Sequence, residues 1–119
     1  MSLLRGKLIL VVEDEPIVAM MIEDLLEELG ARALGPARSN AQALHLAETS
    51  AIDAAILDVN LGDERSYEVA ERLRERGVPF VFATGYGTAG CERFALVETV
   101  RKPFDGDQLA AALERSLSH

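Results

Sequence analysis

The chain has little cysteine and no long apolar run. Cys91 is the only cysteine among 119 residues, so a disulfide-stapled domain is excluded and a reducing, cytoplasmic setting is expected. The longest apolar run, residues 17–22, is far too short for a helix that crosses a bilayer, and no membrane insertion is expected. Residues 1–6 lack the apolar stretch of a signal peptide, and we interpret them as a loose leader.

Basic residues are also scarce. The sequence has 12 Lys and Arg against 20 Asp and Glu, a formal net charge of -8. Direct nucleic-acid binding and adsorption to anionic membranes both need clustered positive charge, so neither is expected. The charge suits a protein that binds a cation or a basic partner surface. With 49% hydrophobic residues, the chain can build the core of one compact domain over residues 1–119.

Two kinds of apolar pattern alternate along the chain. Strands are predicted at residues 8–12, 31–37, 54–58, 79–83 and 97–101; the continuous apolar run at 8–12 is the pattern of a strand that is buried on both faces, and 31–37 is a weaker strand signal. Between them lie segments with apolar residues at helical spacing, whose expected first or capping residues are Pro16, Ser39, Ser66 and Asp105. This alternation predicts an α/β fold with a doubly wound, five-stranded parallel sheet and helices on both faces.

The segment between the fourth and fifth expected strands is poor in helix signals. Gly85, Gly87 and Gly90 fall within six residues, and each glycine costs a helix interior about 1 kcal/mol relative to alanine. We therefore expect the fourth helix, around residues 91–96, to be short or mobile.

Charged and hydroxyl side chains follow the carboxyl ends of the expected strands. Glu13 and Asp14 follow the first strand, Asp58 ends the third, Thr84 ends the fourth and Lys102 follows the fifth. In open α/β sheets, ligands bind beyond the carboxyl ends of the strands, where the winding direction reverses. If the first and third strands are neighbours there, the three acids converge.

Converging carboxylates need compensation. Two carboxylates about 5.5 Å apart repel by roughly 3 kcal/mol at an effective dielectric constant near 20. A divalent cation with a preference for hard oxygen ligands, Mg²⁺ or Ca²⁺, can supply the opposing charge. Lys102 offers a further positive charge and Thr84 a hydroxyl. This set of groups is typical of phosphoryl transfer to a carboxylate.

Four short motifs, VVEDE, ILDVN, FATG and RKPF, occur in this order. With them the chain resembles the receiver domain of two-component response regulators over nearly its whole length. The resemblance implies a flavodoxin-like (CheY-like) fold with strand order 2-1-3-4-5. It also implies a role in phosphorelay signal transduction. The chain would then be no enzyme in its own right but a phosphoacceptor that promotes its own phosphorylation and dephosphorylation and switches a surface for binding a partner.

The resemblance implies a role for each phosphoryl-binding residue. Asp58 would accept the phosphoryl group from a phosphohistidine, on a sensor histidine kinase or a histidine phosphotransfer protein. Lys102 would pair with one phosphoryl oxygen, and Thr84 would hydrogen-bond another and report the modification to the surface. The Lys102–Pro103 peptide bond is expected to be cis.

The resemblance further implies a Mg²⁺ site. Asp14, Asp58 and the main-chain carbonyl of Asn60 would bind the ion, and Glu13 would act mainly through metal-bound water. Glu15, the third acid of the first motif, is interpreted instead as a solvated loop acid.

The sequence departs from the common receiver pattern in its switch residues and in one loop. Thr99 stands where receivers usually have an aromatic residue that moves together with Thr84, and Gly62 stands where proline is frequent. Both features resemble a subgroup of mainly stand-alone receivers with a Phe-Ala-Thr-Gly motif, whose partners are often HWE or HisKA2 kinases. The tyrosine that usually ends that motif is replaced by Gly87, although Tyr86 is adjacent and is a candidate switch residue.

Two other functions use overlapping residues. An aspartate-nucleophile phosphatase of the haloacid-dehalogenase kind also needs Asp, Mg²⁺, Thr and Lys, but its nucleophile normally follows the first strand in an Asp-x-Asp motif. A degenerate receiver would serve only as a protein-interaction module, and the complete set of acids, threonine and lysine disfavours it. The downstream protein target is not identified by the sequence.

Overall fold

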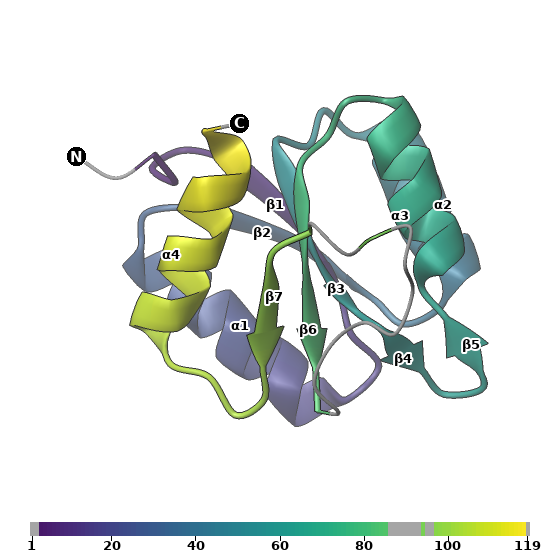
Figure 1. The fold of residues 1–119 in the computed structure, drawn as a ribbon, viewed down its shortest axis with the longest axis horizontal. Helices are drawn as coiled ribbons and strands as arrows, with labels where there is room; N and C mark the ends of the chain where they lie inside the picture. Colours follow the sequence, from purple (N-terminus) through teal and green to yellow (C-terminus); the bar gives the residue numbers. More distant parts are fainter. Residues whose placement is uncertain (1–2, 86–93, 95–96, 119) are drawn as a thin grey trace.

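The computed structural model describes residues 3–85, 94 and 97–118. Its central sheet has five parallel strands, β1 (Leu8–Val12), β2 (Arg32–Ala37), β3 (Ala54–Asp58), β6 (Phe80–Thr84) and β7 (Thr99–Arg101). They lie side by side in the order β2-β1-β3-β6-β7 (Figure 1). Counted along the chain, these strands have the order 2-1-3-4-5, so the sheet predicted from the sequence is confirmed.

Helices cover both faces of this sheet. α1 (Pro16–Glu28) and α4 (Gly106–Leu117) lie on one face, and α2 (Asn40–Thr49) and α3 (Tyr67–Glu75) lie on the other (Figure 1). The fold is therefore the doubly wound, flavodoxin-like arrangement. None of the described helices has the length and apolar character required to pass through a membrane. The fourth helix expected around residues 91–96 falls outside the described residues, apart from the buried Phe94.

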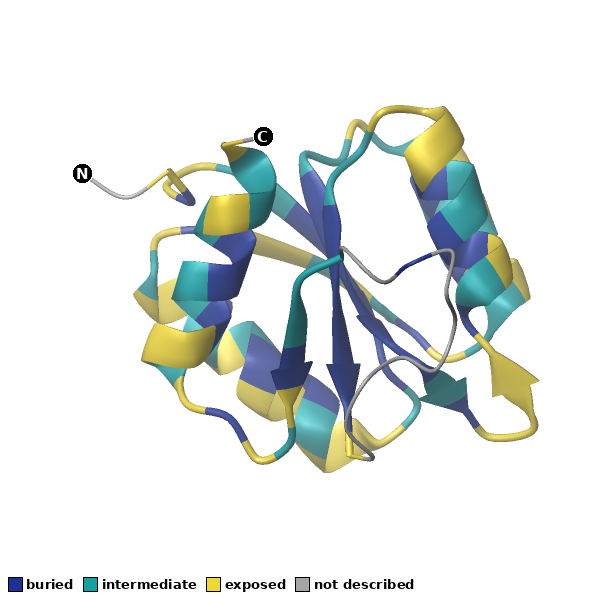
Figure 2. Ribbon diagram, in the orientation of Figure 1, coloured by how far each residue is buried: buried dark blue, intermediate teal, exposed yellow. Residues whose placement is uncertain are grey.

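The three central strands β1, β3 and β6, which are buried along almost their whole length (Figure 2), divide their side chains between two separate cores. In β1, Leu10 and Val12 contact the α2–α3 side, whereas Ile9 and Val11 contact the α1–α4 side. This follows from the two-residue period of a strand. All five residues of β3 are buried, which explains its continuous apolar sequence and leaves only its last residue, Asp58, as a polar terminus.

The structure contains a hairpin that the sequence did not predict. β4 (Asn60–Leu61) and β5 (Glu64–Arg65) pair in antiparallel fashion directly after β3. Gly62 takes a φ of +60° in the connecting turn, a conformation that glycine adopts without steric cost. Two-residue strands are too short to show periodicity, and this is why the hairpin escaped prediction.

The amino-terminal segment corrects a second expectation. Residues 3–6 are not a loose leader: the Leu4 side chain is fully buried in the α1–α4 core, and the Gly6 amide donates a hydrogen bond to the Gly30 carbonyl at 2.8 Å. The burial of one leucine depends on a neighbouring helix and leaves no periodic signal in so short a segment.

Two helix starts agree with the capping signals, whereas Ser66, which precedes α3, makes no side-chain capping hydrogen bond. Ser39 accepts a hydrogen bond from the Gln42 amide at 3.2 Å at the start of α2. At the start of α4, the Asp105 carboxylate accepts from the Gln108 amide at 2.8 Å, and the Gln108 side chain accepts from the Asp105 amide at 2.9 Å. This reciprocal capping box fixes the first turn of α4, the helix that follows Lys102.

Replacing Asp105 by alanine should therefore destabilise the fold by about 1 kcal/mol, because an amide of the first turn of α4 loses its acceptor. Urea unfolding followed by circular dichroism measures the change. Asp107→Ala is the matched control, since Asp107 lies exposed in the same turn without being the cap. Equal losses in the two variants would contradict the role of the capping box.

Candidate acidic active site

The order of the strands brings three acids together. Glu13 and Asp14 follow the carboxyl end of β1, and Asp58 is the last residue of the neighbouring β3. The Glu13 amide donates to the Ala37 carbonyl at 2.9 Å, which holds the backbone beyond β1 against the end of β2. The three side chains can each offer a carboxylate oxygen such that all three oxygens lie within 4.8 Å of one another. The convergence expected at the strand ends is therefore present.

Lys102, which follows β7 at the same end of the sheet, contacts two of these acids. Its Nζ lies 2.9 Å from Glu13 Oε1 and 3.3 Å from Asp58 Oδ2. Glu13 and Asp58 are only 1% and 5% exposed, so both carboxylates are removed from bulk water. Buried charges are tolerated where they are paired and hydrogen-bonded, and the Lys102 ammonium provides that pairing.

Burial and charge shift the protonation of this group. Burial is the largest influence on Glu13 and, opposed by the hydrogen bond from Lys102 but aided by Asp58, raises the pKa of Glu13 from 4.5 to about 7. Burial lowers the pKa of Lys102, but the hydrogen bonds and charges of Glu13 and Asp58 outweigh it and raise the pKa above its ordinary value. Lys102 is therefore a permanent cation at neutral pH.

The cluster opens into a cleft of about 420 Å³, whose lining residues are Asp14, Glu15, Asp58, Asn60, Gly62, Gly85 and Lys102. The Asn60 amide donates to Asp58 Oδ1 at 3.1 Å and so holds the carboxylate from the hairpin side. A Cβ at Gly62 would lie 3.9 Å from Asp14 Oδ2, so the turn passes beside the acids. Proline, with φ fixed near -65°, could not adopt the backbone of Gly62.

The remaining residues singled out in the sequence lie in different surroundings. Thr84 is buried at the end of β6, and its main-chain carbonyl accepts from the Lys102 amide at 2.8 Å. Thr99 lies on β7, where its hydroxyl donates to the Val97 carbonyl at 3.3 Å. Tyr86 lies outside the described residues. The Lys102–Pro103 peptide bond is cis, and so is Gly35–Pro36, which was not predicted.

Glu15 is the site residue that the sequence interpretation missed. It is exposed, as expected of a loop acid, but its carboxylate lines the cleft and its Oε1 lies 3.7 Å from Lys102 Nζ. Its amide donates to Glu13 Oε2 at 3.1 Å. The pair joins residues 87 positions apart in the chain, and nothing in the local sequence signals it.

The donor set fits a hard divalent cation. Carboxylate oxygens from Glu13, Asp14 and Asp58 are the ligands that Mg²⁺ prefers in proteins, and Asn60 stands at the same cleft. Three clustered acids against one ammonium leave negative charge uncompensated in this group. The cluster therefore fits Mg²⁺ both in its oxygen ligands and in its net negative charge.

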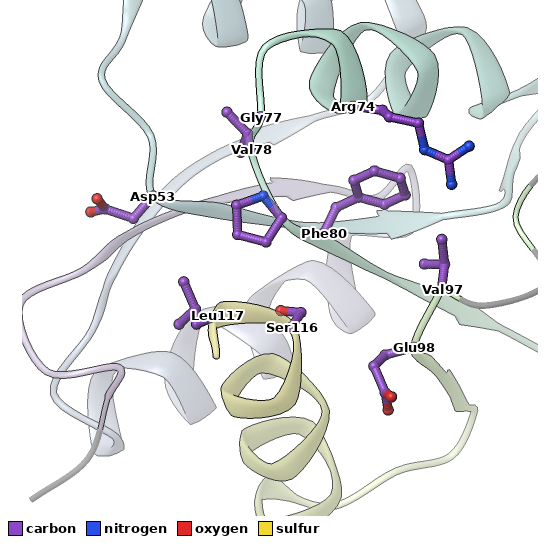
Figure 3. A pocket seen from close by; sticks show the side chains of 10 residues that line it. Asp53, Arg74, Gly77, Val78, Phe80, Val97, Glu98, Ser116 and Leu117 are labelled. Atoms are coloured by element: carbon purple, nitrogen blue, oxygen red, sulfur yellow. The ribbon is translucent and has the colours of Figure 1, made fainter. Parts of the chain in front are cut away.

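A second groove, of about 550 Å³, lies at the opposite ends of the strands (Figure 3). It is bordered by the start of β6 and the end of α4, and its charged groups already have partners. Asp53 Oδ2 accepts from the Leu8 amide at 2.8 Å, Glu98 pairs with Arg115 at 2.8 Å, and the Arg74 guanidinium lies 4.6 Å from the centre of the Phe94 ring. The acidic cleft is therefore the better candidate for chemistry.

Known proteins share this fold and length of chain. SdrG from Sphingomonas melonis, of known solution structure, is 48% identical, with both chains covered completely and a TM-score of 0.85. The receiver domain of a sensor histidine kinase from Pseudomonas aeruginosa is 29% identical over 96% of this chain and 99% of that one, with a TM-score of 0.83. That structure holds a magnesium ion coordinated in its active site cleft.

Longer regulators match as well. The phyllosphere-induced regulator PhyR of Methylorubrum extorquens is 35% identical over 118 residues, which are 92% of this chain but 43% of that protein. The chain spans less than half the length of the curated relatives it matches. Residues 9–114 match the response regulator receiver domain family. With its parallel sheet and its acids at the strand ends, the chain belongs to the response regulator receiver domain family.

Proposed function

We propose that this chain relays signals by accepting a phosphoryl group on Asp58. The observation that carries the proposal is the contact of the buried Asp58 carboxylate with the Lys102 ammonium at 3.3 Å, in the lining of the acidic cleft. A carboxylate that is fixed by an ammonium and by the Asn60 amide is positioned as a nucleophile. The chain acts as a stoichiometric phosphoacceptor in the cytoplasm and not as an enzyme that turns over a separate substrate.

Each residue of the site has a separate role in phosphoryl transfer. An Asp58 oxygen forms the bond to phosphorus while the bond from phosphorus to the donor's histidine nitrogen breaks, and the electron pair stays with the imidazole. Lys102 holds an oxygen of the transferred group, and Thr84, at the end of β6, hydrogen-bonds another. Mg²⁺ held by Glu13, Asp14, Asp58 and the Asn60 carbonyl would neutralise negative charge on the phosphoryl oxygens.

The donor we propose is a sensor histidine kinase, of the HWE or HisKA2 type, or a histidine phosphotransfer protein. Family membership and the likeness to SdrG and PhyR support this class of donor. Phosphorylation adds charge and acceptor oxygens, and these shift an existing equilibrium of the domain toward a state that binds a protein target. Thr84, Tyr86 and Thr99 are the residues through which we propose that the surface responds.

Asp58→Asn should abolish phosphorylation, because an amide cannot form the acyl phosphate. Protein incubated with Mg²⁺ and acetyl phosphate, analysed by intact-protein mass spectrometry, should gain one phosphoryl group in the wild type and none in the variant. Asp63→Asn is the matched control, since Asp63 lies exposed in the nearby hairpin turn and does not line the cleft. The control should be phosphorylated like the wild type.

Two results would overturn the assignment. An undiminished phosphoryl adduct in Asp58→Asn would place the acceptor elsewhere. Multiple turnover of a small phosphate ester by the wild type would favour the phosphatase alternative.

Asp14→Asn should weaken Mg²⁺ binding by about tenfold or more, because the cation loses a charged oxygen ligand. Titration of Mg²⁺ into ¹⁵N-labelled protein, followed through the amide signals of Asn60 and Lys102, measures the affinity. Asp24→Asn removes an equal charge from the exposed side of α1 and should leave the affinity near that of the wild type. Absence of Mg²⁺-dependent shifts in the wild type would instead favour an interaction module without phosphotransfer.

A further inference from the structure

Helix capping does not explain the position of the Glu15 side chain. Glu15 is the residue that precedes α1, yet its side chain makes no capping hydrogen bond to the helix. Its side chain is 65% exposed, and the carboxylate is directed to the cleft, where Oε1 lies 3.7 Å from Lys102 Nζ. The backbone of Glu15 is fixed by the hydrogen bond from its amide to Glu13 Oε2. The acid is therefore held at the entrance while its oxygens stay accessible to water.

The charge of Glu15 acts at short range on the phosphoacceptor. Lys102 Nζ lies 3.7 Å from Glu15 Oε1 and 3.3 Å from Asp58 Oδ2, so the two carboxylate oxygens are at most about 7 Å apart. This is less than the Debye length of about 8 Å at physiological ionic strength, so salt screens the pair only in part. A group that approaches Asp58 through the cleft therefore meets the Glu15 charge.

The other charges of the cleft can balance one another without Glu15, so the Glu15 carboxylate is an excess negative charge. Glu13, Asp14 and Asp58 carry at most three negative charges, which one divalent cation and the Lys102 ammonium match. Glu15 adds a fourth carboxylate to the same cleft, and Lys102 is the one cation among the described residues that line it. Its negative charge is thus available to act on an incoming ligand.

We propose that Glu15 is a specificity-determining residue that discriminates among phosphoryl donors by their charge and slows phosphorylation by small, highly anionic donors. This inference rests on the proposed phosphorylation of Asp58. Repulsion between the Glu15 carboxylate and an anionic donor opposes its entry into the cleft, and it grows with the number of charges on the donor.

Two small phosphoryl donors test the effect of donor charge, because both phosphorylate Asp58 but they differ in net charge. With acetyl phosphate, a dianion at neutral pH, the new oxygen–phosphorus bond forms on Asp58 as the bond to the acetyl oxygen breaks, and acetate leaves with the electron pair. With phosphoramidate, a monoanion whose nitrogen is already protonated, the phosphorus–nitrogen bond breaks and ammonia leaves with the electron pair. The same Asp58 oxygen is phosphorylated, and the donors differ in net charge.

Glu15→Gln should raise the second-order rate constant for acetyl phosphate by about three- to tenfold at low ionic strength, the range expected for charges about 7 Å apart near a protein surface. The increase for phosphoramidate should be smaller, about two- to threefold. Glu15→Asp should stay near the wild type, and Glu15→Lys should exceed Glu15→Gln. Rates are measured at saturating Mg²⁺ by quenched-flow mass spectrometry.

Two controls vary the salt concentration and the position on α1 from which a negative charge is removed. At 1 M salt the Debye length is about 3 Å, so the advantage of Glu15→Gln should fall toward onefold. Glu28→Gln removes the same charge from the exposed far end of α1 and should leave both rates unchanged. Binding of beryllofluoride, an anionic phosphoryl analogue, gives a readout without turnover, and Glu15→Gln should lower its Kd by about threefold.

The outcomes separate this inference from the proposed function. Equal rates for Glu15→Gln and the wild type with both donors, or a change that persists at 1 M salt, would overturn the role of the Glu15 charge while phosphorylation of Asp58 still stands. An equal increase in Glu28→Gln would assign the effect to net charge and also overturn it. A wild type that takes up no phosphoryl group from either donor would refute the proposed function itself.

Discussion

The Lys102 ammonium between the Glu13 and Asp58 carboxylates is the interaction on which this molecule depends. It joins three chain segments, the ends of β1, β3 and β7, that come together only because parallel strands place these ends at one edge of the sheet. The Lys102 amide is itself bonded to the Thr84 carbonyl, so the ammonium is held by the backbone as well as by its partners. Loss of this cation would leave two buried acids uncompensated, a costly arrangement.

The sheet and the acids were predictable because their signals are local and strong. Residues 8–12 and 54–57 are continuous apolar runs, each followed directly by an acid, and parallel order then places these ends together. The capping box of Asp105 and Gln108 was equally visible. The β4–β5 hairpin was missed because two-residue strands carry no period, and Leu4 was missed because its burial depends on tertiary packing. β7 is shorter than expected and begins at Thr99, because side-chain character does not fix where pairing with the neighbouring strand begins.

Glu15 shows where sequence reasoning reached its limit. Its exposure was anticipated, but exposure alone did not reveal that the carboxylate faces Lys102 across the cleft. A resemblance carries over only those positions that the family pattern names, whereas the electrostatics of a cleft include every charge within a few ångströms. Glu15 is such a charge at the border of this cleft.

The separation of the two cores has a consequence for the exchange of parts among related proteins. The α2–α3 layer meets the sheet through one set of alternate side chains, such as Leu10 and Leu57, and the α1–α4 layer through the other, such as Ile9 and Ile56. A graft that replaces one helical layer must match only its own set of strand residues. The two helical layers can thus diverge independently, while the shared sheet keeps the acids and Lys102 in place at the ends of its strands.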